Sequence, residues 1–503
     1  MVTTYSSENI MVLRRTLVLF TLVSVSAGCA VGPEYRKPEV QLSDHYLGKT
    51  QVEQRSAAAK ANIEAWWEGF NDPLLTRFVS LAFDQNLDLA QASARISQAR
   101  SGLSMTNVAL LPSGNLNASA ARNHQSLETP LGQLLNATPG FDRNGSQYEA
   151  DIGASWEMDV FGGLHRDREA AIAEYQASEA GKNATRLAVA AKTADLYIII
   201  RSLQTRIAIA RNQLETQQKL LSIVGLLHSK GLAPKLQVHQ VEGARAQTQA
   251  TIPALEASLE EALNALDVML GVPPGTYRAE LTPVQNIPSP PQISSMGTPA
   301  DLLRRRPDLI VAERRLAASN ARIGAAIAEY YPKFSITALL GTATAISTGN
   351  LFSSGANQAA GVLGLRWRLF DFGRINAQIE LAKGQEAEAL AAYRQAALRA
   401  TEDVENAIFS LVKREEQTGL LLQSEAAFSQ ARNASFVAYQ KGVVSLIEVL
   451  HADENLLRTS DAKAQAQTEA ARSAVAAFKA LGGGWDERNP ASQSPNALSM
   501  NNH

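Results

Sequence analysis

Acidic residues recur on one face of a short alternating segment of the chain. Between residues 147 and 160 every second side chain is apolar, and the intervening set is polar. In an extended strand this spacing separates the two sets onto opposite faces. Charged residues beside water and apolar residues beside lipid are typical of a wall around an aqueous lumen. A second segment near residue 366 has the same pattern with basic residues, so the predicted lumen residues are Glu149, Asp151, Glu157, Asp159, Arg366 and Arg368.

Catalytic chemistry has little support in the sequence. The chain has 7 His and 1 Cys, and it contains no His-rich metal spacing, nucleophile elbow or phosphate loop. With 47 basic and 49 acidic residues it has no cationic excess that would favour nucleic acid. We therefore expect no enzyme activity, no cofactor, no metal site and no nucleic-acid partner.

The single cysteine, Cys29, follows a targeting segment. Arg14 and Arg15 precede an apolar run over residues 17–25, which is too short to span a membrane. Residues 26–29 are similar to a bacterial lipobox, in which the cysteine thiol is acylated and becomes the first mature residue. We predict lipid attachment at Cys29.

The same set of elements occurs twice along the chain. A shift of 220 residues places Pro112 on Pro332, and a shift of 211 places Trp156 on Trp367. The shifts differ because the tryptophan follows the proline by 44 positions in the first copy and by 35 in the second. Such a duplication must be interpreted before any single motif.

Each copy contains two segments with the alternation of a strand. They lie at about 112–124 and 147–161, and at about 332–342 and 359–371. A soluble hairpin packed on a core would alternate in the same way. If the strands enter a membrane, four of them cannot close a barrel, and lipid does not tolerate an open edge. We then expect three chains to share a barrel of twelve strands.

Long helices follow the strands. No proline interrupts the residues between Gly162 and Lys230, which are rich in Ala, Gln, Leu, Arg and Glu. They predict one helix of about 65 residues, roughly 100 Å long at the standard helical rise. Heptad spacing in its lower half indicates coiled-coil packing. Such helices would also suit a coiled-coil spacer that has no pore.

Composition divides the chain into segments. Residues 271–298 are rich in Pro, Gly and Ser, which favours a linker rather than a core element. The C-terminal tail, rich in Asn, Ser and Pro, is expected to be disordered. The predicted order is a signal peptide (1–28, with translation starting at Met1 or Met11), a lipidated extended segment (29–61), the first repeat (62–270), the linker (271–298), the second repeat (299–481) and the tail (482–503).

Five motifs, spread over the whole mature chain, carry a family resemblance. They are Trp66-Trp67 with Asp72-Pro73-Leu74, Trp156 with Asp159-Val160-Phe161-Gly162, Arg306-Pro307-Asp308-Leu309, Tyr331-Pro332 and Leu369-Phe370-Asp371-Phe372-Gly373-Arg374. Together they resemble the outer-membrane factor family, the TolC-like channel-tunnels, in its lipoprotein branch that serves resistance-nodulation-division efflux systems.

The resemblance implies a fold, a location and partners. The chain would be mainly α-helical, with a duplicated helical hairpin and four transmembrane strands. Three copies would form a homotrimer with a barrel in the bacterial outer membrane and a helical tunnel in the periplasm. The trimer would be the passive, lipid-anchored conduit of a tripartite pump for small toxic compounds. Its partners would be a periplasmic adaptor protein, an inner-membrane transporter and outer-membrane lipid.

Two alternatives to this function stay open. Within the family, the chain could be the tunnel of a type I protein secretion system. Outside it, the chain could be a structural coiled-coil lipoprotein without a pore.

The resemblance also implies docking tips and a gate. Two Lys-Gly breaks match the helical tips that meet the adaptor, although glycine is also the normal way to end a helix. The usual gate aspartate is replaced by His451, with Asp453 and Glu454 nearby, and a solvated helix face would explain these charges as well. The predicted tip residues are Lys230, Gly231, Leu232, Ala233, Lys441, Gly442, Val443 and Val444.

Overall fold

The computed structural model describes residues 30–53, 55, 60–293 and 296–485. The predicted signal peptide, both candidate start residues and the predicted lipid attachment site, Cys29, lie outside this range. Among the described residues, none of the helices combines the length and the hydropathy that a membrane-spanning helix requires.

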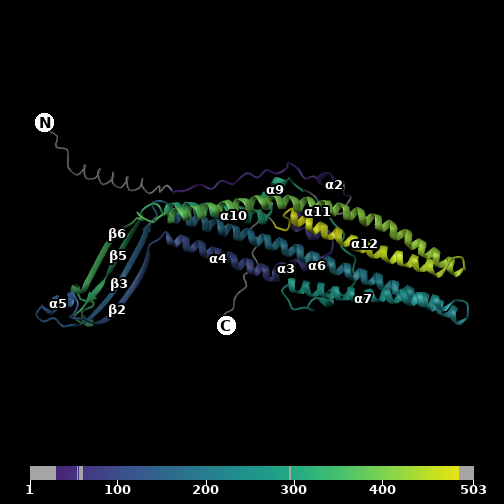
Figure 1. The fold of residues 1–503 in the computed structure, drawn as a ribbon, viewed down its shortest axis with the longest axis horizontal. Helices are drawn as coiled ribbons and strands as arrows, with labels where there is room; N and C mark the ends of the chain where they lie inside the picture. Colours follow the sequence, from purple (N-terminus) through teal and green to yellow (C-terminus); the bar gives the residue numbers. More distant parts are fainter. Residues whose placement is uncertain (1–29, 54, 56–59, 294–295, 486–503) are drawn as a thin grey trace, which may run out of the picture. The chain divides into compact units, whose positions relative to one another are not determined.

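The prediction of a mainly helical chain with four longer strands is confirmed (Figure 1). The elements are, in order, α2 (Lys49–Glu53), β1 (Lys60–Ala61), η1 (Ile63–Phe70), α3 (Pro73–Gln85), α4 (Leu87–Ala109), β2 (Ser113–His124), α5 (Pro130–Asn136), β3 (Asn144–Met158), α6 (Gly163–Ser229), α7 (Lys235–Met269), α8 (Arg278–Leu281), β4 (Gln292–Ile293), α9 (Pro299–Arg305), α10 (Pro307–Ala328), β5 (Lys333–Thr344), η2 (Thr348–Asn350), η3 (Ser354–Ala356), β6 (Asn357–Arg366), α11 (Arg374–Gln440) and α12 (Leu446–Ala480).

The chain divides into two compact units, and each unit contains parts of both sequence repeats. Of the described residues, unit 1 comprises 30–38, 97–176 and 313–391, and unit 2 comprises the others. This division differs from that of the repeats because α6 and α11, with 67 residues each, have residues in both units.

Unit 1 contains an antiparallel sheet with the strand order β2-β3-β5-β6 (Figure 1). Each repeat supplies one hairpin, and β3 pairs with β5 where the two hairpins meet. Three strands lie close to the predicted ranges. The fourth, β6, ends at Arg366, although alternation predicts a strand as far as residue 371.

The helical hairpins of the two repeats have equal dimensions. The helices α6 and α11 have 67 residues each, and their return helices α7 and α12 have 35 each. The helix predicted between Gly162 and Lys230 is observed as α6. Since both hairpins have the same lengths, the duplication extends to the whole helical part of each repeat.

The largest apolar core lies in unit 2 and includes part of the predicted linker. Trp66 is fully buried, and its ring stacks on that of Phe478 with centroids 5.7 Å apart. Leu281 and Ile293 belong to the same cluster. The prediction that residues 271–298 contribute no core element is wrong at these two positions. Proline determines the backbone shape there, but apolar side chains between prolines still gain free energy from burial.

The first four residues of the predicted disordered tail, residues 482–485, are held by hydrogen bonds. The backbone N–H of Gly484 donates to Ile63 O at 2.9 Å, and the indole N–H of Trp485 donates to Arg305 O at 3.1 Å. Residues 482–485 are therefore fixed to unit 2, whereas residues 486–503 lie outside the described range. The indole of Trp485 therefore fixes the start of the otherwise polar C-terminal tail to unit 2.

Candidate functional site

The polar face of the sheet holds acids with different surroundings. Asp151 is only 4% exposed, and its Oδ1 accepts a hydrogen bond of 2.6 Å from the side-chain amide of Gln358. The same amide donates to Glu149 at 3.1 Å. A Cβ at the facing Gly341 would lie 1.9 Å from Asp151 Oδ1, so only glycine leaves room for this carboxylate. Asp151 is thus held between strands, while Glu149 is half-buried beside it.

Acids and bases form a network at the other end of this face. Lys333 Nζ lies 2.5 Å from a carboxylate oxygen of Glu329 and 3.8 Å from Glu157. Arg368 Nη1 lies 3.0 Å from the second oxygen of Glu329. Partial burial acts to raise the pKa of Glu329, but the bonds to Lys333 and Arg368 outweigh it and hold this pKa below its ordinary value. Arg368, predicted to face a lumen from a strand, instead lies beyond the end of β6 in an ion-pair network.

Asp159 requires a similar correction. Strand β3 ends at Met158, and Asp159 Oδ2 accepts the backbone N–H of His165 at 2.8 Å. Asp371 does the same in the second copy, where it accepts the backbone N–H of Ile375 at 2.8 Å. A carboxylate at a helix start satisfies free N–H groups and interacts favourably with the helix dipole. Asp159 therefore caps α6 and is not part of the strand face.

The two hairpin tips have the same backbone geometry. Gly231 and Gly442 have φ of 72° and 73°, the left-handed region that favours glycine. In the first tip Leu232 N–H donates to Leu227 O, and in the second Val443 N–H donates to Ala438 O, both at distances that close a Schellman turn (2.8 and 2.9 Å). Each glycine is thus required to end a helix, whatever the tip binds.

Next to each glycine lies an exposed apolar side chain. Leu232 is 74% exposed and Val443 is 75% exposed, whereas Ala233 is buried. The basic residues Lys230 and Lys441 are exposed beside them. Each tip therefore presents one apolar and one cationic side chain to solvent.

An apolar cluster joins the two tips within unit 2. Its buried side chains come from α6, α7 and α12, and α11 contributes the partly buried Phe436 and Tyr439. Both turns lie at the same end of the helices in Figure 1. The cluster positions the turns side by side. Its buried members are Leu220, Val224, Val241, Leu446 and Val449.

The three candidate gate residues lie in different environments. His451 and Glu454 are exposed on α12, and Glu454 pairs with Arg458 one turn later at 2.6 Å. Asp453 is 1% exposed, and its Oδ1 accepts a hydrogen bond of 2.9 Å from Arg432 Nε on α11. Burial raises the pKa of Asp453, and Arg432 offsets only part of this effect. Asp453 therefore fixes α12 to α11 and is not a free charge on the helix surface.

Arg432 is a residue that the sequence interpretation missed. A signal was present, because Arg432 and Asp453 lie at equal distances from the turn between Gly442 and Val443. In a helical hairpin such positions face each other. The pairing of opposite charges across the turn would have identified the contact.

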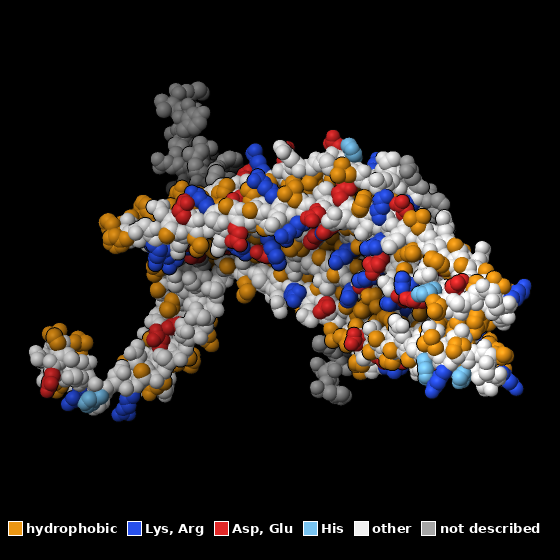
Figure 2. Space-filling model, turned by 45° about the vertical axis from the view of Figure 1, so that its right-hand side comes forward, with side chains coloured by type: hydrophobic (Ala, Val, Ile, Leu, Met, Phe, Trp, Pro, Cys, Tyr) orange, Lys and Arg blue, Asp and Glu red, His pale blue; other side chains and the backbone are white. Residues whose placement is uncertain are grey.

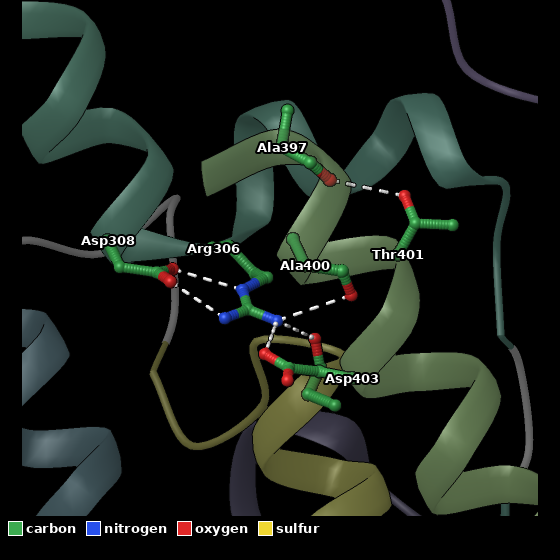
Figure 3. Close-up of polar contacts among 7 residues, drawn as sticks. Arg306, Asp308, Ala397, Ala400, Thr401 and Asp403 are labelled. Atoms are coloured by element: carbon green, nitrogen blue, oxygen red, sulfur yellow. Dashed lines mark hydrogen bonds and ion pairs between the residues drawn. The ribbon is translucent and has the colours of Figure 1, made fainter. Parts of the chain in front are cut away.

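Arg306 joins three helices in unit 2 (Figure 3). Its guanidinium donates to both carboxylate oxygens of Asp308, at 3.0 and 2.7 Å, and to Asp403 on α11 at 2.9 Å. It also reaches the carbonyls of Ala400 and Ala480 at 3.4 Å. Arg306 thus connects the start of α10 to α11 and to the end of α12. Elsewhere on the helices, basic and acidic side chains are interspersed on the face drawn in Figure 2.

Comparison with known proteins gives matches along most of the chain. The family profile described as outer membrane efflux protein matches residues 78–272 and 298–483. The chain is 30% identical to the pyoverdine export outer membrane protein OpmQ of Pseudomonas putida, over 87% of this chain and 92% of that protein. It is 29% identical to nodulation protein T of Rhizobium leguminosarum bv. trifolii, over 94% and 98%. Among solved structures, the outer-membrane channel OprN is 30% identical and superposes with a TM-score of 0.81, over 91% of this chain and 100% of that one.

Proposed function

The chain belongs to the outer membrane efflux protein family, and on this premise we propose that three copies form a passive export conduit for small toxic compounds. Its fold is that of the outer-membrane channels, and it is an efflux protein of the outer membrane. The observation that carries the proposal is the pair of open sheet edges, because β2 and β6 each pair on one side only. In lipid such edges must be paired, and three copies supply twelve strands for a closed barrel.

The polar face of the sheet would line the barrel. Glu149, Asp151 and Glu157 on β3 and Arg366 on β6 are the strand residues that we assign to the lumen. Their apolar neighbours on the opposite face, such as Ile152 and Leu363, are 64% and 72% exposed. Exposed aliphatic side chains on the outer face suit contact with lipid tails.

The hairpin tips would contact a periplasmic adaptor protein, which joins the channel to an energised inner-membrane transporter. Leu232 and Val443 offer apolar side chains that a partner helix can bury, and Lys230 and Lys441 offer cationic rims. His451 and Glu454 are the residues that we assign to the periplasmic gate, since both are exposed on α12. The transporter, not this chain, would supply energy and select the substrate.

Acylation of Cys29 would anchor the protein to the outer membrane. Replacing Cys29 with Ser should remove acyl labelling and leave the trimer intact, because the anchor lies outside the strands and helices described above. Mass spectrometry of the mature N-terminus would test this directly.

Conductance and export together test the proposed function. The purified protein should migrate as a trimer and open pores in planar bilayers, and its deletion should lower the tolerance of the cell to small toxic compounds. A chain without a pore would contradict the proposal and favour a structural coiled-coil lipoprotein. Loss of secretion of a protein, with unchanged tolerance to toxic compounds, would instead favour a type I secretion tunnel.

Photo-crosslinking at the tips tests the adaptor contact. A photoreactive residue in place of Leu232 or Val443 should capture an adaptor protein in cells, while Gly231 and Gly442 are kept because their backbone conformation is needed. The matched control is the same residue at Leu422, which is 56% exposed within α11. Equal capture at the control position would contradict tip docking.

A further inference from the structure

The duplication relates the two hairpins of the sheet residue by residue. In the first hairpin Ser113 on β2 lies opposite Ser155 on β3. Adding the sequence shifts of 220 and 211 to these two positions gives Lys333 and Arg366, which lie opposite each other in the second hairpin. The shifts obtained from sequence therefore transfer the strand register of one copy onto the other.

A side-chain contact obeys the same relation. The indole N–H of Trp156 donates to Leu110 O at 2.9 Å. The shifted partners are Trp367 and Tyr330, and the indole N–H of Trp367 donates to Tyr330 O at 3.0 Å. The two copies therefore agree in side-chain geometry as well as in backbone pairing.

The central pairing of the sheet connects one copy to the next. Strand β3 of the first copy pairs with β5 of the second, and Trp156 lies opposite Ile336. Adding 211 to the position of Trp156 gives Trp367, and subtracting 220 from the position of Ile336 gives Leu116. The duplication therefore converts this pair into Trp367 and Leu116. Trp367 directly follows the end of β6, and Leu116 lies on β2. β6 and β2 are the opposite edges of the sheet, so within one chain they are separated by two other strands.

We propose that β6 pairs antiparallel with β2 of the partner subunit, in the register that places Trp367 opposite Leu116 of the partner subunit. The inference rests on the proposed trimer and specifies its subunit interface. The same register places Leu365 opposite Ala118 of the partner subunit, and Leu363 opposite Ala120 of the partner subunit.

The early end of β6 supports this register. Strand β3 continues through residues 156–158, beyond its last pair with β2 at Ser155, because these residues pair with β5. Their counterparts in the second copy are residues 367–369. Strand β6 ends at Arg366, the last residue that pairs with β5. Residues 367–369 thus have no pairing residues on β5 within the chain, and β2 of the partner subunit would supply them. Residues 367–369 become strand when the subunits assemble.

The side chains at both edges also fit the register. Leu116 on β2 is 73% exposed, and Leu365 and Trp367 at the other edge are 62% and 55% exposed. The proposed register brings these apolar side chains onto one face, as the pair Trp156 and Ile336 lies on one face within the chain. A slip by one residue would place apolar residues opposite polar ones, because successive side chains alternate in direction. Slips by two residues keep the faces and are excluded by the duplication alone.

Paired cysteines in the full-length protein distinguish these registers. Directly opposed Cβ atoms lie about 4.5–5.5 Å apart, and diagonal neighbours about 7–8 Å. A disulfide requires Cβ atoms about 3.5–4.5 Å apart, so it forms readily only between opposed residues. The register variant is A118C/L365C, and the matched controls are L116C/L365C and A120C/L365C, which represent slips by two residues in either direction.

The readout is the covalent trimer on a non-reducing gel after mild oxidation of outer-membrane preparations. The register variant should form covalent dimers and trimers at least tenfold more efficiently than either slipped variant. Each single-cysteine variant controls for linkage through Cys29. If the first variant fails to assemble, A120C/L363C tests the same register at another position.

The outcomes separate the register from the proposed function. Efficient linkage of a slipped variant would overturn the register, and so would the absence of linkage in register variants that still export. In both cases the export channel itself would stand. If the wild-type protein forms neither trimers nor pores, the proposed function fails and this inference fails with it.

Discussion

The buried ion pair near the second tip allows one prediction to be developed in detail. Replacing Arg432 with Met removes the partner of Asp453 and keeps an unbranched side chain at this position. The side chain of Asp453 is 2% exposed in the wild type, and the side chain of Arg432 is 24% exposed. The variant therefore leaves a buried carboxylate without its counter-charge.

The expected cost follows from the burial of the two groups. Removing one partner of a buried pair costs about 3–5 kcal/mol, and the partial exposure of Arg432 favours the lower end, about 3 kcal/mol. Protonation of Asp453 limits the cost to about 4 kcal/mol at pH 7, because that is the free energy of neutralising a carboxyl group whose ordinary pKa is about 3.9. A loss of about 3 kcal/mol raises the population of the locally open tip by about two orders of magnitude.

Amide hydrogen exchange on the assembled protein measures this local opening. Amides at the start of α12 should exchange about 100-fold faster in R432M than in the wild type at pH 7. The matched control is R458M, which breaks the exposed pair with Glu454 on the same helix and should change exchange by less than about threefold. The double variant R432M/D453N should recover most of the protection, since it removes the buried charge as well.

Acidification should reverse much of the R432M defect. Burial raises the pKa of Asp453, so the folded tip binds its proton more tightly than the unfolded chain does. The stability contributed by this group is fully present below the ordinary carboxyl pKa and is lost as pH rises through the folded pKa. At pH 5 neutralisation costs only about 1.5 kcal/mol, so the effect of R432M should shrink to about tenfold. Equal exchange in R432M and wild type at pH 7, or a defect that grows on acidification, would refute the reasoning.

Two further predictions concern single positions in unit 2. Gly231→Ala should destabilise the first tip by about 1 kcal/mol, because φ of 72° is costly for alanine. Gly243→Ala within α7 should instead stabilise the hairpin by about 0.5–1 kcal/mol, because alanine favours a helix more than glycine does. Exchange rates of the tip amides that change in the same direction in both variants would contradict this. Asp72→Ala should cost about 2–3 kcal/mol, because the carboxylate caps α3 and accepts the hydroxyl hydrogen of Tyr197 at 2.7 Å. Tyr197→Phe keeps the cap and should cost only about 1 kcal/mol in thermal unfolding, so equal losses in both variants would show that the cap contributes nothing.

Much of the architecture could be predicted because it depends on local periodicity. The duplication, the alternating strands and the uninterrupted helices are each encoded within a few tens of residues. The glycines at the two tips are similar, since a helix that must turn back needs a residue with positive φ. Even the strand that reaches beyond Arg366 in the alternation pattern is expected from sequence, and the proposed subunit contact explains why a single chain does not form it.

The environments of the charged residues could not be predicted in the same way. Alternation placed Asp159 on a strand face, but β3 ends at Met158 and Asp159 instead accepts a backbone N–H at the start of α6. Alternation also gave no sign that Arg368 pairs with Glu329 in the single chain. Arg306 connects residues that are 97 and 174 positions away along the chain, a distance over which periodicity carries no information. Arg432 was overlooked because its role as an ion-pair partner depends on Asp453, which lies on the other helix of the hairpin.

The sequence by itself determined the repeat, the elements and the face of each strand, because side-chain spacing within one element decides these. Only the tertiary structure decided which charges are free and which are neutralised, that linker residues such as Leu281 belong to the core, and where the strands stop. These properties depend on burial and on pairs of groups from different elements. Both arise when the chain folds, since the free energy of a charge or an apolar side chain depends on what surrounds it.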